Sequence, residues 1–199
     1  MADKKILLAT TNKGKLAELE IMLRSRNISL LSLQSFSSFP DVEENGSSFE
    51  ENALIKANAY FKEFNIPTIA DDSGLCVDFL DGRPGIHSAR YSGQGATDSL
   101  NIIKLLNDIQ SASRPVKAHF HCSAIYVDGE ITIISSGKVF GTILSEPKGT
   151  HGFGYDPVFL PNGYTLTMAE LGEEVKNKIS HRAKAMEDLI EKLNSVSKI

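Results

Sequence analysis

The sequence predicts an α/β fold with a mixed central sheet and flanking helices, and three features support that prediction. Short apolar runs typical of strands alternate with segments whose apolar residues recur at helical spacing. One long hairpin, turning at Asp128-Gly129, interrupts the alternation, so the sheet is not expected to be purely parallel. The length of 199 residues suits a single domain, residues 1–199, with a sizeable hydrophobic core.

The N-terminal part of the chain is predicted to contain two strands and two helices. Residues 6–10 and 29–33 are short apolar runs typical of strands, and between them apolar residues recur at helical spacing from Lys13. A second helix is expected after Ser48, because Ser48 and Glu51 form a capping-box signature. Its buried stripe, which continues to the end of the helix, is predicted to be Ala53, Ala57, Tyr60, Phe61 and Phe64.

The middle of the chain is predicted to continue with a strand, a long loop and a helix. Residues 67–70 form a strand that ends at Asp71-Asp72-Ser73-Gly74, a sequence typical of turns. Residues 81–95 are rich in glycine and are expected to form an ordered loop. Thr97 can cap a helix whose core face is Ile102, Leu105, Leu106 and Ile109.

The C-terminal part is predicted to contain the hairpin, a second glycine-rich loop and a last helix. Residues 116–127 and 131–140 are the two arms of the hairpin, and residues 149–157 form the loop. Ser180 is expected to cap the last helix. The inward face of that helix is predicted to be Met186, Leu189, Ile190 and Leu193.

Charge and cysteine content limit the classes of function. The chain has 21 Lys and Arg against 25 Asp and Glu, a formal net charge of −4, which argues against nucleic-acid or membrane-surface partners. Cys76 and Cys122 are too few for a disulfide framework, which favours a reducing compartment. Because no run of about 18 apolar residues occurs, and the first apolar run is too short for a signal peptide, we expect a cytoplasmic, soluble protein.

Two predicted helices begin with cations, although the partial positive charge of a helix start favours acids. Lys13 and Lys15 follow Asn12, and His181-Arg182 follows Ser180. An anion bound at such a helix start would offset the unfavourable charge and accept the free backbone N–H groups. Both are therefore candidate phosphate or polar-ligand sites. A solvated basic helix end explains a single occurrence more simply, and two occurrences in one chain weaken that explanation.

Acidic residues supply a complementary candidate site. Asp71 and Asp72 follow a predicted strand, and Glu43 and Glu44 lie in a predicted loop over residues 36–46. Oxygen-only clusters of this kind suit Mg²⁺, which takes one or two carboxylates and leaves other positions to water and phosphate. The alternative is that the aspartates only hydrogen-bond the backbone of a turn.

Three further candidates have simpler structural interpretations. His119 and His121 alternate along a predicted strand without the spacing of metal ligands, which favours solvated or hydrogen-bonded histidines. Two aromatic rings in the loop 153–156 would either stack on a base or close the core beneath the loop. Lys56 lies away from the apolar stripe of its helix and is expected at the surface.

Because no Walker A, nucleophile-elbow or zinc-protease motif occurs, bound phosphates would be handled by a metal and carboxylates.

Five motifs occur in a fixed order along nearly the whole chain, from about residue 6 to 193. They are Thr10-Thr11-Asn12-Lys13-Gly14-Lys15, Asp71-Asp72-Ser73-Gly74-Leu75, Pro84-Gly85-Ile86-His87-Ser88-Ala89-Arg90-Tyr91, Gly152-Phe153-Gly154-Tyr155-Asp156-Pro157 and Ser180-His181-Arg182. Each is modest alone, but the ordered set closely resembles the inosine/xanthosine triphosphate pyrophosphatase family. The chain departs from the family pattern at Ala183, where glycine is usual.

This resemblance implies a homodimeric, Mg²⁺-dependent α/β enzyme with a strongly twisted sheet and two lobes around an active-site cleft. It implies hydrolysis of the non-standard purine nucleoside triphosphates ITP, dITP and XTP to the monophosphate and pyrophosphate. Such an activity cleanses the nucleotide pool and keeps deaminated purines out of DNA and RNA.

The resemblance also implies roles for individual residues. Asp72 would be the proton acceptor and a metal ligand, with Glu43 and Glu44 helping to hold Mg²⁺, and Ser73 would contact the substrate. The triphosphate would be held by Thr10, Thr11, Asn12, Lys13, Gly14, Lys15 and Lys56, and the base by Phe153, Gly154, Tyr155, Asp156, Lys176, His181 and Arg182.

Two other functions fit the same motifs. A related pyrophosphatase would act on pyrimidine or modified triphosphates, and a non-catalytic sensor would bind purine nucleotides in the same pocket. The paired acids favour an enzyme, because a pure binding protein gains little from carboxylates beside phosphates. Arg182 suits purine selection, because it can donate to the O6 and N7 acceptors of hypoxanthine and xanthine, whereas adenine presents an amino donor.

Overall fold

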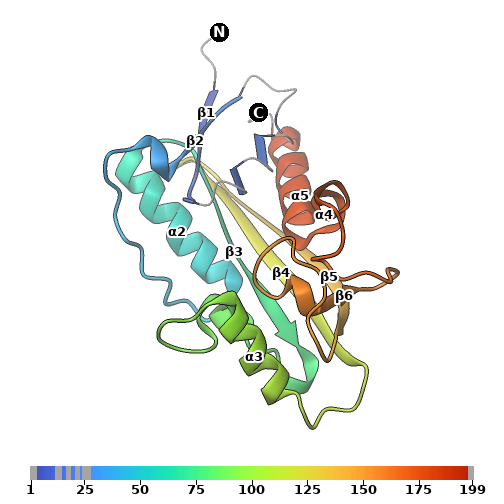
Figure 1. The fold of residues 1–199 in the computed structure, drawn as a ribbon. Coiled ribbons are helices and arrows are strands. Elements are labelled where there is room, and N and C mark those ends of the chain that lie inside the picture. Colours follow the sequence, from blue (N-terminus) through green and yellow to red (C-terminus); the bar gives the residue numbers. More distant parts are fainter. Residues whose placement is uncertain (1–3, 12–14, 17–18, 21–22, 24–27, 197–199) are drawn as a thin grey trace. The chain divides into compact units, whose positions relative to one another are not determined.

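The computed structural model describes residues 4–11, 15–16, 19–20, 23 and 28–196 (Figure 1). The chain divides into two compact units. Unit 1 comprises residues 1–72, 122–137 and 182–199, and unit 2 comprises residues 73–121 and 138–181. Among the described residues, no helix is both long and apolar enough to cross a membrane.

In the described part of the chain, six strands form one mixed sheet, in the order β2-β1-β3-β4-β5-β6. β1 pairs in parallel with both β2 and β3, whereas β5 and β6 are antiparallel, so the predicted mixed α/β fold is confirmed. The strands are β1 (Lys4–Leu8), β2 (Ile28–Ser32), β3 (Thr68–Val77), β4 (Val116–Val127), β5 (Thr132–Ile143) and β6 (Phe159–Pro161).

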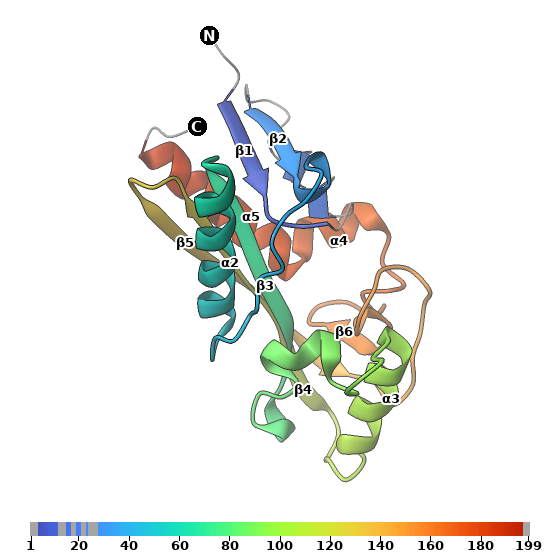
Figure 2. The same ribbon diagram turned by 90° about the vertical axis from the view of Figure 1, so that its left-hand side faces the viewer.

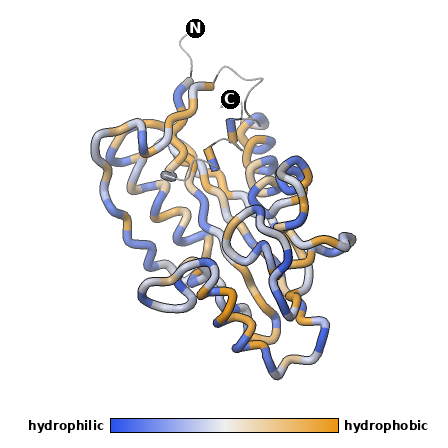
Figure 3. The backbone as a smooth tube through the Cα atoms, viewed as in Figure 1, coloured by the Kyte–Doolittle hydropathy of each residue, from blue (hydrophilic) through white to orange (hydrophobic). Residues whose placement is uncertain are grey.

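Helices α2 (Phe49–Phe64) and α5 (His181–Ser195) cover opposite faces of the strands in unit 1. Side chains alternate along β1, so Ile6 and Leu8 pack in the cluster that contains the apolar face of α5, whereas Leu7 packs with the cluster of α2. Hydrophobic and hydrophilic residues alternate along both helices (Figure 3). The predicted inward face of α5 is confirmed, because all four of its residues are buried.

Unit 2 has its own apolar core beneath α3 (Asp98–Asp108), which Figure 2 shows beside β4 and β6. Thr97 caps α3 as predicted, since its side chain accepts a hydrogen bond from the backbone N–H of Leu100. Ile102, Leu105 and Ile109 are buried in this core, and Leu106 packs against it. A short helix that the sequence did not predict, α4 (Glu173–Ile179), precedes α5.

The start of α2 follows the predicted pattern only in part. Ser48 is the N-cap and accepts a hydrogen bond from the backbone N–H of Glu51. The Glu51 carboxylate, however, accepts from the backbone N–H and the hydroxyl of Ser47, at 2.6 and 2.7 Å. In a complete capping box, the Glu51 carboxylate would accept from the backbone N–H of Ser48. It accepts from Ser47 instead, the residue before the N-cap, because Ser47 offers it two donors.

Strand β3 corrects a second prediction. The sequence places a turn at Asp71-Asp72-Ser73-Gly74, whereas the structure continues the strand through these residues to Val77. Both aspartates therefore lie in the middle of a ten-residue strand, not at its end.

Candidate active site

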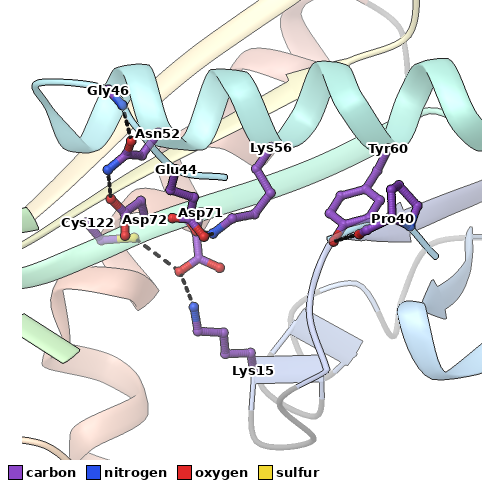
Figure 4. A network of polar contacts seen from close by, with 10 residues as sticks. All are labelled: Lys15, Pro40, Glu44, Gly46, Asn52, Lys56, Tyr60, Asp71, Asp72 and Cys122. Atoms are coloured by element: carbon purple, nitrogen blue, oxygen red, sulfur yellow. Dashed lines mark hydrogen bonds and ion pairs between the residues drawn. The ribbon is translucent and has the colours of Figure 1, made fainter. Parts of the chain in front are cut away.

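Asp71 and Asp72 leave β3 on opposite faces of the sheet, because consecutive side chains of a strand alternate. Asp71 Oδ2 accepts hydrogen bonds from Lys15 Nζ at 2.7 Å (Figure 4) and from Arg182 Nε at 3.4 Å. The side chain of Asp71 is 2% exposed and that of Arg182 is 6% exposed. Two cations from distant parts of the sequence thus compensate one buried carboxylate.

The charge of Asp71 is fixed by this environment. Burial alone would raise the pKa of Asp71, but the positive charges of Lys15 and Arg182 outweigh burial, so the pKa lies well below its usual range. The carboxylate is therefore ionised at neutral pH and a very weak base. A group of this kind positions cations but is poorly suited to accept a proton from water.

Asp72 lies on the face of the sheet that α2 covers. Its Oδ2 accepts a hydrogen bond from Asn52 Nδ2 at 3.0 Å (Figure 4). The same amide accepts a hydrogen bond, at 2.8 Å, from the backbone N–H of Gly46, which ends the loop that carries Glu44. Asp72 is half-buried, whereas Asp71 is fully buried. Of the two aspartates, Asp72 is therefore the one that a bound molecule can reach.

Lys56 follows Asn52 by one helical turn on α2 and points in the same direction (Figure 4). Its Nζ donates to the backbone carbonyl of Asp71 at 3.1 Å and lies 3.0 Å from Glu44 Oε1. Only 15% of the Lys56 side chain is exposed. The expectation of a surface lysine was wrong, because a carbonyl and a carboxylate draw the ammonium group inward.

Cys122 is a buried cysteine beside Asp71, with Sγ 4.0 Å from Asp71 Oδ2. Burial, followed by the negative charge of Asp71, raises the pKa of Cys122 far above its usual range. The thiol is therefore protonated at neutral pH and cannot act as a nucleophile.

In unit 2, Asp156 organises the second glycine-rich loop. Its Oδ2 forms an ion pair of 2.6 Å with Lys176 Nζ and accepts the backbone N–H of Phe153 at 3.1 Å. The Lys176 ammonium group also lies 4.6 Å from the centre of the Phe153 ring, a cation–π distance. The Phe153 side chain nevertheless remains 49% exposed. A planar ligand can therefore stack on this ring.

The other aromatic ring of this loop has a structural role. Tyr155 is buried, and its hydroxyl donates to the backbone carbonyl of Ser88 at 2.9 Å. The interpretation that both rings close the core is thus right for Tyr155 and wrong for Phe153. Between them, the backbone N–H of Gly154 donates to Asp98 at the start of α3, at 2.7 Å.

The beginning of α5 is also closely packed. The His181 ring stacks on Phe120, with ring centres 4.9 Å apart and an interplanar angle of 12°. Ala183, the departure from the family pattern, is 2% exposed. Its methyl group is accommodated in the first turn of the helix.

The model of the Ham1 family matches residues 6–192. The chain belongs to the Ham1 family. It is 48% identical to a dITP/XTP pyrophosphatase of Halalkalibacterium halodurans over 188 residues, which cover 94% of this chain and 97% of that protein. It is 47% identical to a dITP/XTP pyrophosphatase of Geobacter sulfurreducens, with 92% of each chain covered.

Solved structures of Ham1 proteins have the same fold. The HAM1 protein of Coxiella burnetii superposes with a TM-score of 0.91 at 41% identity, over 96% of this chain and 99% of that one. The Ham1 protein of Staphylococcus aureus gives a TM-score of 0.89 at 39% identity, over 97% and 100% of the two chains.

The acidic side chains of this Ham1 chain bear on whether it can hold a metal ion. Within the described residues, no group of three or more His, Cys, Asp or Glu side chains is close enough to hold a metal ion. Mg²⁺, however, needs only one or two carboxylates when phosphate and water complete its shell. Asp72 and Glu44 fit that smaller set, because Asn52 and Lys56 draw them to neighbouring turns of α2. Glu43, in the same loop, is exposed.

The predicted site residues fall into two groups in this Ham1 chain. Asn12, Lys13 and Gly14 lie outside the described residues. Thr10 and Thr11 follow β1, where their backbone carbonyls accept hydrogen bonds from Leu33 N and Gln34 Nε2. Unit 1 also holds Lys15, Glu43, Glu44, Lys56, Asp72 and Arg182, and unit 2 holds Ser73, Phe153, Gly154, Tyr155, Asp156, Lys176 and His181.

The sequence did not predict the roles of two residues that organise the site. Asp71 was expected in an acidic cluster suited to Mg²⁺, not as the counter-ion of Lys15 and Arg182. A signal existed, because a carboxylate that directly follows the buried run Ile69-Ala70 requires a cation if it is buried too. Asn52 carries no comparable signal, since Asp72, the acid that it contacts, lies 20 residues further along the chain.

Proposed function

We propose that the chain is a nucleoside-triphosphate pyrophosphatase that hydrolyses ITP, dITP and XTP to the monophosphate and pyrophosphate. Its relatives that are named dITP/XTP pyrophosphatases support this proposal. The observation that carries it is the pair Asp71 and Asp72, in which one carboxylate holds cations and the other remains reachable. An enzyme of this kind would cleanse the nucleotide pool of deaminated purines.

We assign the triphosphate to residues of unit 1. A nucleoside triphosphate carries about four negative charges, which cations must offset before water can approach phosphorus. Lys15 and Lys56 carry two such cations, and both are already oriented by Asp71. Residues 10–14 complete this part of the proposed site.

We assign proton acceptance to Asp72. Water would attack the α-phosphorus, the bond from that phosphorus to the α–β bridging oxygen would break, and pyrophosphate would leave. The proton of the attacking water would pass to the Asp72 carboxylate. The very low basicity of Asp71 supports the choice of Asp72. Asp72, Glu43 and Glu44 would hold Mg²⁺, whose charge offsets that of the phosphate oxygens.

We assign base recognition to Arg182 and to the residues around Phe153. The exposed ring of Phe153 can stack on a purine, with about 1–3 kcal/mol gained per stacked base. Arg182 can donate to the O6 and N7 acceptors of hypoxanthine and xanthine, and the family resemblance assigns Lys176 to the residues that enclose the base. Ser73, Gly154, Tyr155, Asp156 and His181 complete the proposed substrate contacts.

We further propose that residues 1–199 form a single catalytic domain that acts on free nucleotides as a cytoplasmic homodimer. These assignments rest on the family resemblance. Light scattering of the purified protein at micromolar concentration tests the oligomeric state, since a monomer mass would contradict it.

Incubation of the purified protein with ITP and Mg²⁺, followed by identification of the products, tests the proposed function. IMP and pyrophosphate are expected. IDP and inorganic phosphate would contradict the proposal, and so would the absence of products. In a substrate panel, ITP and XTP should be hydrolysed far faster than dTTP and UTP.

A further inference from the structure

Asn52 is a buried amide in the first half of α2, and none of the steps above uses it. Only 1% of the residue is exposed to solvent. Its Nδ2 donates to Asp72 Oδ2 at 3.0 Å, and its Oδ1 accepts the backbone N–H of Gly46 at 2.8 Å (Figure 4). Both ends of one amide therefore have a partner in the candidate active site.

The orientation of this amide is determined by its partners. The backbone N–H of Gly46 can only donate, and the Asp72 oxygen that Asn52 contacts accepts. The Asn52 oxygen must therefore face Gly46 and its NH₂ group must face Asp72. The reverse orientation would lose both hydrogen bonds and leave buried polar groups without partners.

The loop that carries Glu43 and Glu44 approaches Asn52 very closely at Gly46. A Cβ atom at this position would lie 2.7 Å from Glu51 Cβ and 2.8 Å from Asn52 Oδ1. Glycine is therefore required for the contact between the loop and the amide. As a result, one side chain connects the acidic loop to the carboxylate on β3.

We propose that Asn52 is a positioning residue, which orients the Asp72 carboxylate and ties the loop 43–46 to it. This inference rests on the proposed function, since it assigns Asn52 to the step in which Asp72 accepts a proton. Proton transfer requires a fixed donor–acceptor geometry, and a displacement of about 1 Å can cost about 10²-fold in rate.

Asn52→Asp tests this proposal with the smallest change in shape. One carboxylate oxygen can still accept from Gly46, whereas the other would face Asp72 and repel it. We expect kcat for ITP to fall about 10²-fold, whereas the Kd of a non-hydrolysable imido analogue of ITP changes less than about threefold. Asn58→Asp is the matched control, because Asn58 is an exposed residue of the same helix. It should leave kcat unchanged.

A second measurement does not depend on turnover. Asn52→Asp should lower Tm by about 5 °C, and the exchanged pair Asn52→Asp with Asp72→Asn should recover most of that loss. The exchanged pair restores an amide opposite a carboxylate, but it leaves position 72 without a proton acceptor and should stay inactive.

The two proposals fail in different ways. A wild-type protein that releases no pyrophosphate from ITP would contradict the proposed function, while the Tm values would still report the contact between residues 52 and 72. The positioning role is overturned if Asn52→Asp keeps the wild-type kcat, if analogue binding is lost in proportion to kcat, or if the exchanged pair recovers no stability.

Discussion

Lys15 and Asp71 form a short ion pair, with 2.7 Å between Lys15 Nζ and Asp71 Oδ2, although 56 residues separate them in the sequence. The parallel pairing of β1 with β3, in which Leu8 lies opposite Ile69, brings the segments that follow these two residues together. A cation of the proposed triphosphate site is therefore oriented by the residue next to the proposed proton acceptor.

Asp71→Asn should destabilise the protein strongly. The amide keeps the shape of the side chain but removes the negative charge that Asp71 places beside Lys15 and the buried Arg182. Removing one partner of a buried ion pair costs about 3–5 kcal/mol, which corresponds to a drop in Tm of about 10 °C for a chain of this size. Thermal unfolding measures the change.

Asp188→Asn is the control for that experiment. It removes a carboxylate from an ion pair with Lys192 that lies one helical turn away and is exposed on both sides. Its effect should stay within about 0.5 kcal/mol. If both variants lost the same free energy of unfolding, the buried ion pairs of Asp71 would stabilise the protein no more than an exposed pair does.

Asp72→Asn should abolish most turnover while substrate binding is largely kept. The amide has nearly the same shape but cannot accept the proton of the attacking water, which should reduce kcat by about 10²–10⁴-fold. Pyrophosphate release from ITP and equilibrium binding of a non-hydrolysable analogue separate the two effects. Wild-type turnover in this variant would show that Asp72 is not the proton acceptor.

Gly152→Ala should weaken binding of the nucleotide base. An added Cβ would collide with the Asp156 carboxylate and lie 2.9 Å from Lys176 Nζ, so the ion pair that organises the Phe153 loop must shift. We expect KM for ITP to rise about tenfold, in line with the loss of about 1.4 kcal/mol of stacking. Steady-state kinetics with ITP give both constants.

Gly163→Ala separates this collision from backbone strain. Gly163 has φ of 85°, close to the 81° of Gly152, but among the described residues no atom beyond its two chain neighbours lies within 4 Å of an added Cβ. Both variants suffer the strain of a left-handed backbone. Only Gly152→Ala should therefore raise KM, and a similar rise in both would contradict the role of the ion pair.

His121 should make the protein less stable as the pH falls from about 6.5 to 4. Burial, assisted by Lys138 and His119, lowers the pKa of His121 to about 4. Between about 6.5, the pKa of an unfolded histidine, and 4, the unfolded chain binds a proton that the folded chain does not. The stabilisation from neutral His121 is therefore complete above pH 6.5 and is lost as the pH falls through this window.

His121→Gln should reduce that pH dependence, because glutamine does not titrate. The difference in Tm between wild type and this variant is expected to shrink from pH 7 to pH 4. His151→Gln is the comparison, since His151 is exposed. Parallel Tm curves for wild type and His121→Gln would refute the assignment.

Local signals predicted most of the secondary structure. The N-caps Ser48 and Thr97 and the hairpin at Asp128-Gly129 depend on residues within a few positions of one another, and all three occur as expected. The prediction failed at β3, because aspartates are disfavoured in strands and suggested a turn. The strand continues there since Lys15 and Arg182 neutralise the buried carboxylate.

The roles of the site residues could also be predicted only in part. The ordered motifs were sufficient to recognise the family, and the resemblance made Asp72, Lys15 and Lys56 candidates. They did not distinguish the ring of Phe153, which is exposed, from that of Tyr155, which is buried. That difference depends on Ser88, whose carbonyl binds the Tyr155 hydroxyl from a distant segment.

The mixed α/β class, the N-caps Ser48 and Thr97 and the family could all be predicted from patterns of neighbouring residues along the chain. The fold was needed to show that Asp71 holds cations while Asp72 stays reachable, and that Asn52 connects Asp72 to the acidic loop. The charge and orientation of a carboxylate depend on burial and on the partners that folding brings to it, and the partners of these two aspartates come from other segments of the sequence.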